Sequence, residues 1–480
     1  MIAAPRQADA APSPALMAKL AELLGPRGFT TAPEDLAPWL ADWRGRLTGA
    51  AAALVSPATP AETAAVVRLA AAEGVAIVPQ GGNSSMVGGA TPPADGHALL
   101  LSMRRMRAIR AISGEDNVAV AEAGVVLSDL HDAAEAIGRR FPLSLAAKGS
   151  ATVGGLISTN AGGTQVLRFG TMRALVLGIE AVLPDGSLFE GLSALRKDNR
   201  GYDLRQLMVG AEGTLGIVTA ASLKLVSLPA ARAVAWAGLG DPAAALALLR
   251  RLEAALGDAI ESFEIVPADG LALVLQHIPG TRAPLGDAHR WNLLIETTAP
   301  TGNPREPLEA ALMQAIEEGV IEDATIAASE AQAEALWKLR ETMSEAERVD
   351  GLAAKHDVAV PVSAMPRFLE EASEAVEARF PGARVLAFGH LGDGNVHFNV
   401  RAPAGADDRA WLAAQGPAVS AFVHDLAGAA GGSLSAEHGI GQTKLDEFRR
   451  TADPARVAAL RAIKSALDPK GIMNPGKLVP

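Results

Sequence analysis

The chain has 480 residues, 49% of them hydrophobic and 20% charged, which is typical of a globular protein with two or three domains. It contains no cysteine, which excludes disulfides, thiolate zinc sites, iron–sulfur clusters and cysteine nucleophiles. A formal net charge of −11 without a basic run argues against nucleic acid as a partner, and no apolar stretch reaches the ~20 residues of a membrane span.

The N-terminal part predicts a domain at residues 16–228 after a disordered tail at 1–15. The tail has Pro, Asp and Gln where a signal peptide needs an apolar core, so a cytoplasmic location is expected, with an organellar transit segment as the alternative. Helical spacing begins at Leu16, and a helix over 60–73 follows the capping residue Thr59. Strands are expected at 75–79, 98–102, 117–122, 176–183 and 217–224, with a helix over 127–138.

Two glycine-rich segments in this part can hold a phosphate-bearing cofactor. The first, PQGGNSSMVGG, directly follows a predicted strand, and the second runs over 149–163. Glycines let successive N–H groups point at a phosphate, although the first segment alone could be an ordinary turn. Because no P-loop or Rossmann motif occurs, a long cofactor lying extended along both segments is favoured. The candidate cofactor-binding residues are Pro79, Gly81, Gly82, Asn83, Ser84, Ser85, Gly88, Gly89, Gly149, Ser150, Thr152, Gly154, Gly155, Ser158, Thr159, Asn160, Gly162 and Gly163.

The second half changes character and predicts an α+β domain with a largely antiparallel sheet at residues 229–450. Helices are expected at 242–256, 307–318, 328–347 and 366–379, and they alternate with isolated strands such as 291–297 and 384–388. Residues 451–480 form a last, helical segment.

The segment HLGDGNVHFN predicts a metal-binding hairpin. With Asp393 and Gly394 as a two-residue turn, His390 lies directly opposite His397, and Asn399 shares their face. Two imidazoles held in this way can chelate a metal ion. A pair of histidines that only form hydrogen bonds is the alternative.

Downstream, Glu437 and His438 stand side by side in SAEHGIG. Glu437 would complete a His₂-carboxylate set with His390 and His397, which suits Zn²⁺ or a similar divalent ion and leaves a position open for substrate. His438 would then be available for proton transfer. A helix N-terminus without chemistry is the alternative for this segment.

Cationic residues in the second half can hold a carboxylate. Arg340 and Ser344 are four residues apart in a predicted helix and would share a face, and Lys355 precedes a strand predicted at 357–361. From the sequence alone, ordinary solvated side chains are the more common explanation.

Taken together, the segments PQGGN, ISTNAGG, GAEGTLGIVT, FGHLGDGNVHFN, EHGIGQTK and MNPGK resemble the FAD-linked D-2-hydroxyacid dehydrogenases of the vanillyl-alcohol-oxidase-type superfamily. The resemblance implies a two-subdomain FAD-binding domain, a cap domain that binds substrate and metal, and a C-terminal segment that returns to the FAD domain. It adds Glu212, Gly213, Ile217 and Asn474 to the FAD site. Asn83 stands where members with a covalent flavin have a histidine, so non-covalent FAD is expected.

The resemblance also implies roles for the second half. His390, His397 and Glu437 would bind the metal and His438 would be the base. The candidate substrate-binding residues are Arg340, Ser344, Lys355 and Asn399. The leading reaction is oxidation of D-2-hydroxyglutarate to 2-oxoglutarate. D-lactate or another D-2-hydroxy monoacid, a flavin-free zinc hydrolase and a non-catalytic flavin-binding subunit are the alternatives. An electron-transfer flavoprotein, a quinone or oxygen would reoxidise the flavin, and relatives are often homodimers.

Overall fold

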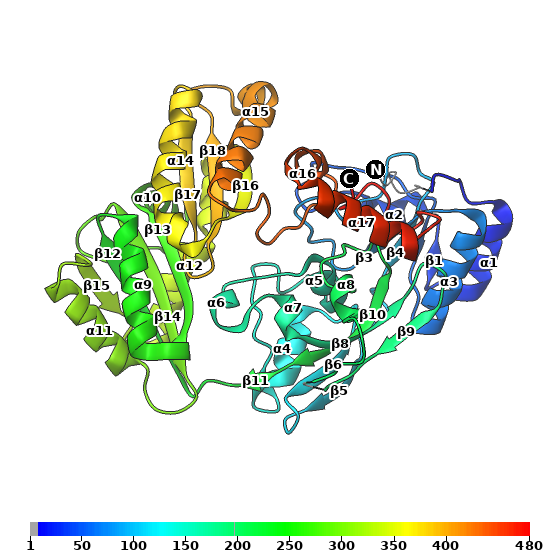
Figure 1. Cartoon of the computed structure of the whole chain (residues 1–480), viewed down its shortest axis with the longest axis horizontal. Coiled ribbons are helices and arrows are strands. Elements are labelled where there is room, and N and C mark those ends of the chain that lie inside the picture. The colour runs from blue at the N-terminus through cyan, green and yellow to red at the C-terminus, as the bar shows by residue number, and fades with distance from the viewer. Residues whose placement is uncertain (1–7, 196) are drawn as a thin grey trace. The chain divides into compact units, whose positions relative to one another are not determined.

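The computed structural model describes all residues except 1–7 and 196, and it divides into two compact units (Figure 1). The first unit comprises the chain up to Gly163, Gly170–Leu228 and Glu437–Pro480, and the second comprises Thr164–Phe169 and Pro229–Ala436. The sequence predicted a continuous second domain at 229–450. The structure instead assigns residues 437–450 to the first unit and 164–169 to the second. The latter segment is held by Gln165 and Arg168, which bind the buried carboxylate of Glu261.

The first unit contains two sheets, as expected for a two-subdomain FAD-binding domain. A four-stranded sheet has the order β1-β2-β4-β3, in which β4 is parallel to both β2 and β3. A five-stranded antiparallel sheet has the order β5-β6-β10-β8-β9. The strands are β1 (Phe29–Thr30), β2 (Ala53–Val55), β3 (Ile77–Gln80), β4 (Leu99–Ser102), β5 (Ile109–Ser113), β6 (Val118–Glu122), β8 (Val176–Val182), β9 (Leu188–Gly191) and β10 (Ile217–Lys224), with a separate ribbon of β7 (Arg139–Arg140) and β11 (Val226–Ser227).

Local sequence signals set several helices of this unit. In α3 (Pro60–Glu73) the Thr59 side chain accepts a hydrogen bond from the Glu62 N–H, Pro60 occupies the first turn, and Gly74 ends the helix with a φ of 71°. The first helix, α1 (Pro14–Leu24), begins two residues earlier than predicted because Ser13 caps it, and residues 1–7 of the predicted tail lie outside the described residues. The other helices are α2 (Pro33–Leu40), α4 (Leu127–Glu135), α5 (Val153–Thr159), α7 (Met172–Leu175), α8 (Arg205–Met208), α16 (Leu445–Thr451) and α17 (Pro454–Leu467).

The second unit is built on one seven-stranded sheet with the order β15-β12-β14-β13-β17-β18-β16. Every neighbouring pair is antiparallel, which confirms the predicted α+β architecture. The strands are β12 (Ala231–Leu239), β13 (Ile260–Pro267), β14 (Trp291–Ala299), β15 (Asp323–Ile326), β16 (Ala353–Ala359), β17 (Arg384–His390) and β18 (Asn395–Arg401).

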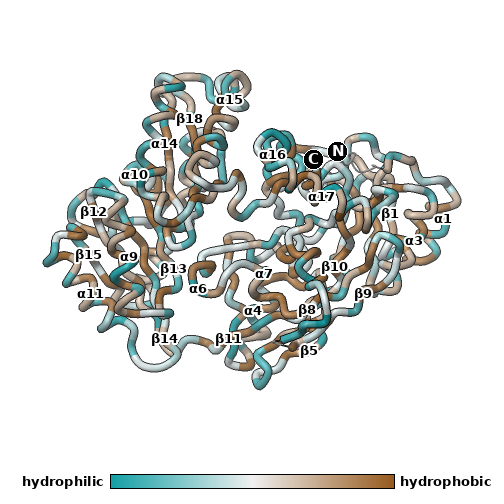
Figure 2. Tube along the Cα trace, in the orientation of Figure 1, coloured by the Kyte–Doolittle hydropathy of each residue, from teal (hydrophilic) through white to brown (hydrophobic). Residues whose placement is uncertain are grey.

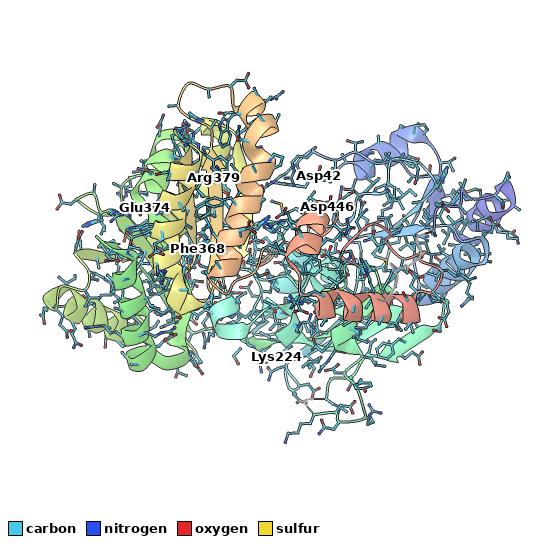
Figure 3. All side chains as sticks on the ribbon, turned by 45° about the horizontal axis from the view of Figure 1, so that its top comes forward. Asp42, Lys224, Phe368, Glu374, Arg379 and Asp446 are labelled. Carbon is cyan, nitrogen blue, oxygen red and sulfur yellow. The ribbon has the colours of Figure 1, made fainter. Side chains whose placement is uncertain are left out.

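Helices cover both faces of this sheet, each over its own apolar core. One core joins the sheet to α9, α11, α14 and α15, and the other joins it to α10, α12 and α13. The most hydrophobic stretches of the trace lie in the sheets (Figure 2). On α14, Phe368 is buried whereas Glu374 and Arg379 are exposed (Figure 3). The bounds are α6 (Val166–Phe169), α9 (Pro242–Leu256), α10 (Ala268–His277), α11 (Arg305–Glu317), α12 (Glu330–Glu341), α13 (Met343–Asp350), α14 (Met365–Arg379) and α15 (Asp408–Ala429), with short 3-10 turns at Gly257–Ala259 and Val362–Ala364.

The single helix predicted over 328–347 is wrong, because α12 ends and α13 begins on either side of Thr342. The N–H of Thr342 donates to the carbonyls of Arg340 and Lys338, and its own carbonyl accepts from Glu345 and Ala346. Thr342 therefore caps both helices. None of the helices in the described part of the chain is long and apolar enough to cross a membrane.

Candidate functional site

The two glycine-rich segments of the first unit lie against each other. A Cβ on Gly82 would come within 1.7 Å of the Ser150 carbonyl oxygen, and one on Gly81 within 2.3 Å of the Thr152 hydroxyl. Only glycine allows the backbone of 79–89 to approach the segment at 149–163 this closely. Asn83, which follows Gly82 in the first segment, has a φ of 52°.

The turn before β10 and the C-terminal segment join the same cradle. The amide of Asn474 donates to the carbonyls of Gly89 (2.9 Å) and Glu212 (2.7 Å), and Gly213 packs against Pro79 without room for a Cβ. Ile217 begins β10 just after this turn. The structure thus brings together both predicted segments and three of the four residues that the resemblance added.

Polar groups in the cradle fit a bound FAD. The Thr152 hydroxyl and the Asn474 Oδ1 are buried without a hydrogen-bond partner among the described residues. Such groups cost free energy unless a ligand or water bonds them. Two of the candidate cofactor-binding residues, Ser158 and Thr159, use their hydroxyls to donate to carbonyls within α5.

Glu212 organises this region from a strained backbone position. It has a φ of 50°, and its buried carboxylate accepts the N–H groups of Ile440 (2.8 Å) and Gly441 (2.7 Å). Burial raises the pKa of Glu212, and those two N–H groups with the cations Lys444 and Lys477 offset only part of the rise. These bonds explain why the segment after Glu437 belongs to the first unit.

The histidine hairpin forms with a register different from the predicted one. His390 faces Asn395 across β17 and β18, and His397 faces Phe388. The turn holds four residues, because the His390 carbonyl accepts the N–H groups of both Asp393 and Gly394. A shift of two residues keeps side chains on the same face, so the rings of His390 and His397 still meet, with centroids 5.5 Å apart.

Potential metal-ligand atoms gather around these rings. His390, His397 and Glu437 each offer one ligand atom, all within 4.8 Å of one another, as predicted. Asp357, Glu437 and His438 form a second such group, which the sequence analysis did not predict. Glu437 directly follows Ala436, whose N–H donates to the Asp357 carbonyl of β16. Asp357 itself is buried and faces His397 across β16 and β18.

Arg340 and His390 share one buried carboxylate. Glu264 on β13 faces His390 across the sheet, and its Oε1 accepts from His390 Nδ1 at 2.7 Å while its Oε2 accepts from Arg340 Nε at 2.9 Å. Burial alone would raise the pKa of Glu264, but His390 and Arg340 together lower it below its ordinary value. Arg340 also lies over the Phe388 ring at 5.0 Å, and its Nη2 is buried without a hydrogen-bond partner among the described residues.

Lys355 and Asn399 share a second buried carboxylate. They face each other across β16 and β18, and Glu347 Oε2 accepts from Lys355 Nζ at 2.6 Å and from Asn399 Nδ2 at 2.9 Å. Glu347 is fully buried, and its Oε1 has no partner within the described part of the chain. Ser344 is exposed on α13, whereas Arg340 is buried at the end of α12. The prediction that the two share one helix face is therefore wrong.

These side chains lie on one face of the seven-stranded sheet because alternate residues of each strand point the same way. Sequence reasoning missed Glu264, Glu347 and Asp357. Glu264 stands between Phe263 and Ile265 in a strand segment, and an acid flanked by apolar residues is a signal that could have indicated a buried, partnered carboxylate.

Charge also fits a divalent ion at this face. Four carboxylates, those of Glu264, Glu347, Asp357 and Glu437, accompany two cations, Arg340 and Lys355, which leaves an excess of negative charge around two imidazoles. A dication would balance that excess, and His and carboxylate groups are ligands that Zn²⁺ accepts.

Comparison with known proteins assigns the class of protein. The family described as FAD linked oxidases, C-terminal domain, matches residues 228–478, and the family described as FAD binding domain matches residues 51–191. Among solved structures, p-cresol methylhydroxylase superposes with a TM-score of 0.73 at 16% identity over 96% of both chains. An alkyldihydroxyacetonephosphate synthase gives 0.71 at 17% identity over 98% of this chain and 87% of that one. The protein is therefore an FAD-binding member of the FAD linked oxidases with a vanillyl-alcohol-oxidase-type fold.

Curated relatives identify the family more closely within this class. The chain is 37% identical to the mitochondrial D-2-hydroxyglutarate dehydrogenase of Bos taurus over 96% of its own length and 82% of that protein. It is 38% identical to the D-2-hydroxyglutarate dehydrogenase of Xanthomonas citri, over 93% of each chain, and 35% identical to that of Stutzerimonas stutzeri, over 97% and 99%. The chain belongs to the family of FAD-linked D-2-hydroxyacid dehydrogenases, oxidoreductases that act on CH–OH groups.

Proposed function

We propose that this enzyme oxidises D-2-hydroxyglutarate to 2-oxoglutarate with non-covalently bound FAD and a divalent metal ion. The main structural support for a dicarboxylate substrate is the buried guanidinium of Arg340. Its Nη2–H is unpartnered among the described residues while Glu264 and Phe388 fix the rest of the group. An unpaired buried donor of this kind favours a ligand carboxylate. The names of the curated relatives favour the same substrate.

The candidate residues would have separate roles in binding and proton transfer. Arg340 and Lys355 would hold the distal carboxylate, with Asn399 beside Lys355. His390, His397 and Glu437 would hold the metal ion, and His438 would take the hydroxyl proton. A bound divalent ion would lower the pKa of the substrate hydroxyl, and FAD would accept the hydride from C2. A substrate contact of Ser344 stays a prediction from the sequence.

The second ligand group offers another assignment for the metal. Asp357, Glu437 and His438 would give one histidine and two carboxylates, which suits a harder ion than Zn²⁺. We favour His390, His397 and Glu437 because this set leaves His438 for proton transfer. The variant His390→Ala should lose metal and turnover while it keeps FAD. If His438→Ala loses the metal instead, the second group is the ligand set.

The deciding experiment follows flavin absorbance after single D- and L-2-hydroxy acids are added anaerobically, with and without a chelator. Rapid bleaching by D-2-hydroxyglutarate that the chelator abolishes supports the whole proposal. Bleaching by D-lactate instead would discard the dicarboxylate preference and keep the chemistry. A cytoplasmic location, reoxidation by an electron-transfer flavoprotein or a quinone, and a homodimer stay predictions from the sequence.

A further inference from the structure

One carboxylate in the second unit contacts both a proposed metal ligand and the proposed substrate anchor. Glu264 is 1% exposed, and each of its oxygens has a different partner: Oε1 accepts from His390 Nδ1 and Oε2 accepts from Arg340 Nε. All three residues belong to the second unit and come from separate elements, β13, β17 and α12.

The bond to Glu264 determines which nitrogen His390 can offer a metal. Because Nδ1 donates its proton to the carboxylate at 2.7 Å, Nε2 is the nitrogen with a lone pair available. A carboxylate behind a ligating histidine fixes the orientation of the ring and makes it a stronger ligand. Glu264 faces His390 directly across the two strands, so the sheet itself sets this geometry.

The other oxygen fixes the guanidinium. With Nε bonded to Glu264 and the Phe388 ring 5.0 Å from its centre, Arg340 has little rotational freedom, and its unpartnered Nη2 is held in one direction. The Phe388 ring also contacts His397, with centroids 5.2 Å apart. The anchor and both imidazoles therefore form one packed cluster.

We propose that Glu264 is a positioning residue that holds His390 and Arg340 in one arrangement and so couples binding of the divalent ion to binding of the distal carboxylate. The inference rests on the proposed function. The carboxylate is buried, and each of its oxygens accepts a hydrogen bond from one of these two side chains. It acts through the two side chains that it bonds.

The test measures Zn²⁺ affinity of the purified flavoprotein and of Glu264→Gln by competition with a chelating dye. An amide can accept from one of the two donors but not from both, so we expect Zn²⁺ to bind about 10- to 100-fold more weakly in the variant. At saturating Zn²⁺, KM for D-2-hydroxyglutarate should rise about 10-fold or more, with a smaller rise for D-lactate, which lacks the distal carboxylate. Flavin content should not change.

The matched control is Glu261→Gln. Glu261 is a buried carboxylate on the same strand that also bonds an arginine, but its partners are Arg168, Gln165 and Thr298. This control should keep the Zn²⁺ affinity of the wild type. Glu264→Asp, which retains the charge but is too short to reach both donors, decides the question if Glu264→Gln does not fold. It should also bind Zn²⁺ more weakly than the wild type.

The outcomes separate the two proposals. Suppose that the wild type binds Zn²⁺ and prefers D-2-hydroxyglutarate, and that a folded Glu264 variant has the same Zn²⁺ affinity and the same KM for D-2-hydroxyglutarate. The positioning role is then wrong and the proposed function stands. If both Glu264→Gln and Glu261→Gln lose Zn²⁺ equally, the effect is general destabilisation and the coupling is also wrong. If the wild type binds no divalent ion, the metal-assisted function and the role of Glu264 fail together.

Discussion

At the scale of single residues, each cation proposed to bind substrate is paired with a buried acid. Arg340 has Glu264 and Lys355 has Glu347. Such pairs lower the cost of burying charge, but removing one partner leaves the other uncompensated, at a cost of about 3–5 kcal/mol in other proteins. The effect of mutating a cation here therefore includes the charge of the acid that remains.

Variants of Lys355 and Glu347 can separate the loss of the cation from the effect of the acid that remains. We expect Lys355→Ala to raise KM for D-2-hydroxyglutarate about 10- to 100-fold, because it removes a charged contact and exposes the substrate to the unpaired Glu347 carboxylate. The double variant Lys355→Ala, Glu347→Gln should recover part of that loss. Steady-state kinetics with D-2-hydroxyglutarate and D-lactate measure both effects. Equal losses for the two substrates would argue against Lys355 as the anchor of the distal carboxylate, and a double variant no better than the single one would exclude a role for the Glu347 charge.

Lys477 makes the stability of the FAD unit depend on pH. Burial lowers the pKa of Lys477 to about 8, and the nearby Glu212 only partly offsets this. Below pH 8 the folded protein carries a buried ammonium. Between about pH 8 and the ordinary lysine pKa of ~10.4 the folded state has released this proton while the unfolded chain still holds it, so stability rises with pH.

Replacing Lys477 should remove that rise. We expect Lys477→Met to be more stable than the wild type at pH 7 by up to about 3 kcal/mol, and the advantage should shrink by pH 9.5. Urea unfolding of both proteins at the two pH values measures the difference, in which the titration of groups that do not interact with Lys477 cancels. An advantage that stays constant with pH would show that Lys477 keeps its proton throughout.

At the scale of helices and strands, the sequence predicted those features that local chemistry sets. The bounds of α3, α9 and β10 agree with the prediction. The two helices each have a capping side chain and a proline in the first turn, and β10 is a run of mostly buried residues. The break at Thr342 was missed because no proline or glycine marks it. The partners of Glu264 and Glu347 could not be predicted, because they lie up to 126 residues away in the sequence, as His390 does from Glu264.

In the histidine hairpin, the predicted turn is wrong but the two imidazoles still lie next to each other. The Asp-Gly pair indicated a two-residue turn, but Asp393 Oδ1 accepts the Asn395 N–H and helps to close a four-residue turn. An even shift preserves the face, so the predicted pairing of His390 with His397 survives as a diagonal contact.

Gly394 should be the residue of this turn that tolerates substitution least. Its φ is 82°, and an added Cβ would come within 2.1 Å of the Val360 carbonyl oxygen. Gly405 has a similar φ of 78° but open space around it. We expect Gly405→Ala to cost about 1–2 kcal/mol of stability from the backbone alone, and Gly394→Ala to cost more and to weaken Zn²⁺ binding. Urea unfolding and dye competition measure the two. Equal costs would mean that the turn relaxes away from Val360.

At the scale of the whole molecule, the first unit is built from segments that are far apart in the sequence. The first unit is completed by its last segment, in which Met473 pairs with Ile77 and buried Lys464 donates to the Thr214 carbonyl at 2.7 Å. Asn474 then bonds both the first glycine-rich segment and the Glu212 turn. The resemblance implied this return, whereas no local pattern in the sequence could show it.

A chain that ends at Ala452 should therefore lose the flavin. It lacks α17 and Asn474, so Gly89 and Glu212 lose the amide that joins them, and the core around Ile77 loses Ile472 and Met473. The milder variant Asn474→Leu, which removes only the two hydrogen bonds, should bind FAD more weakly, by about 30-fold if each of the two bonds contributes about 1 kcal/mol. Flavin absorbance per protein measures both. His390 and His397 lie in the second unit, so we expect Asn474→Leu to keep its Zn²⁺ affinity while its flavin content falls. Full flavin retention by the truncated chain would show instead that its last segment is dispensable for the FAD cradle.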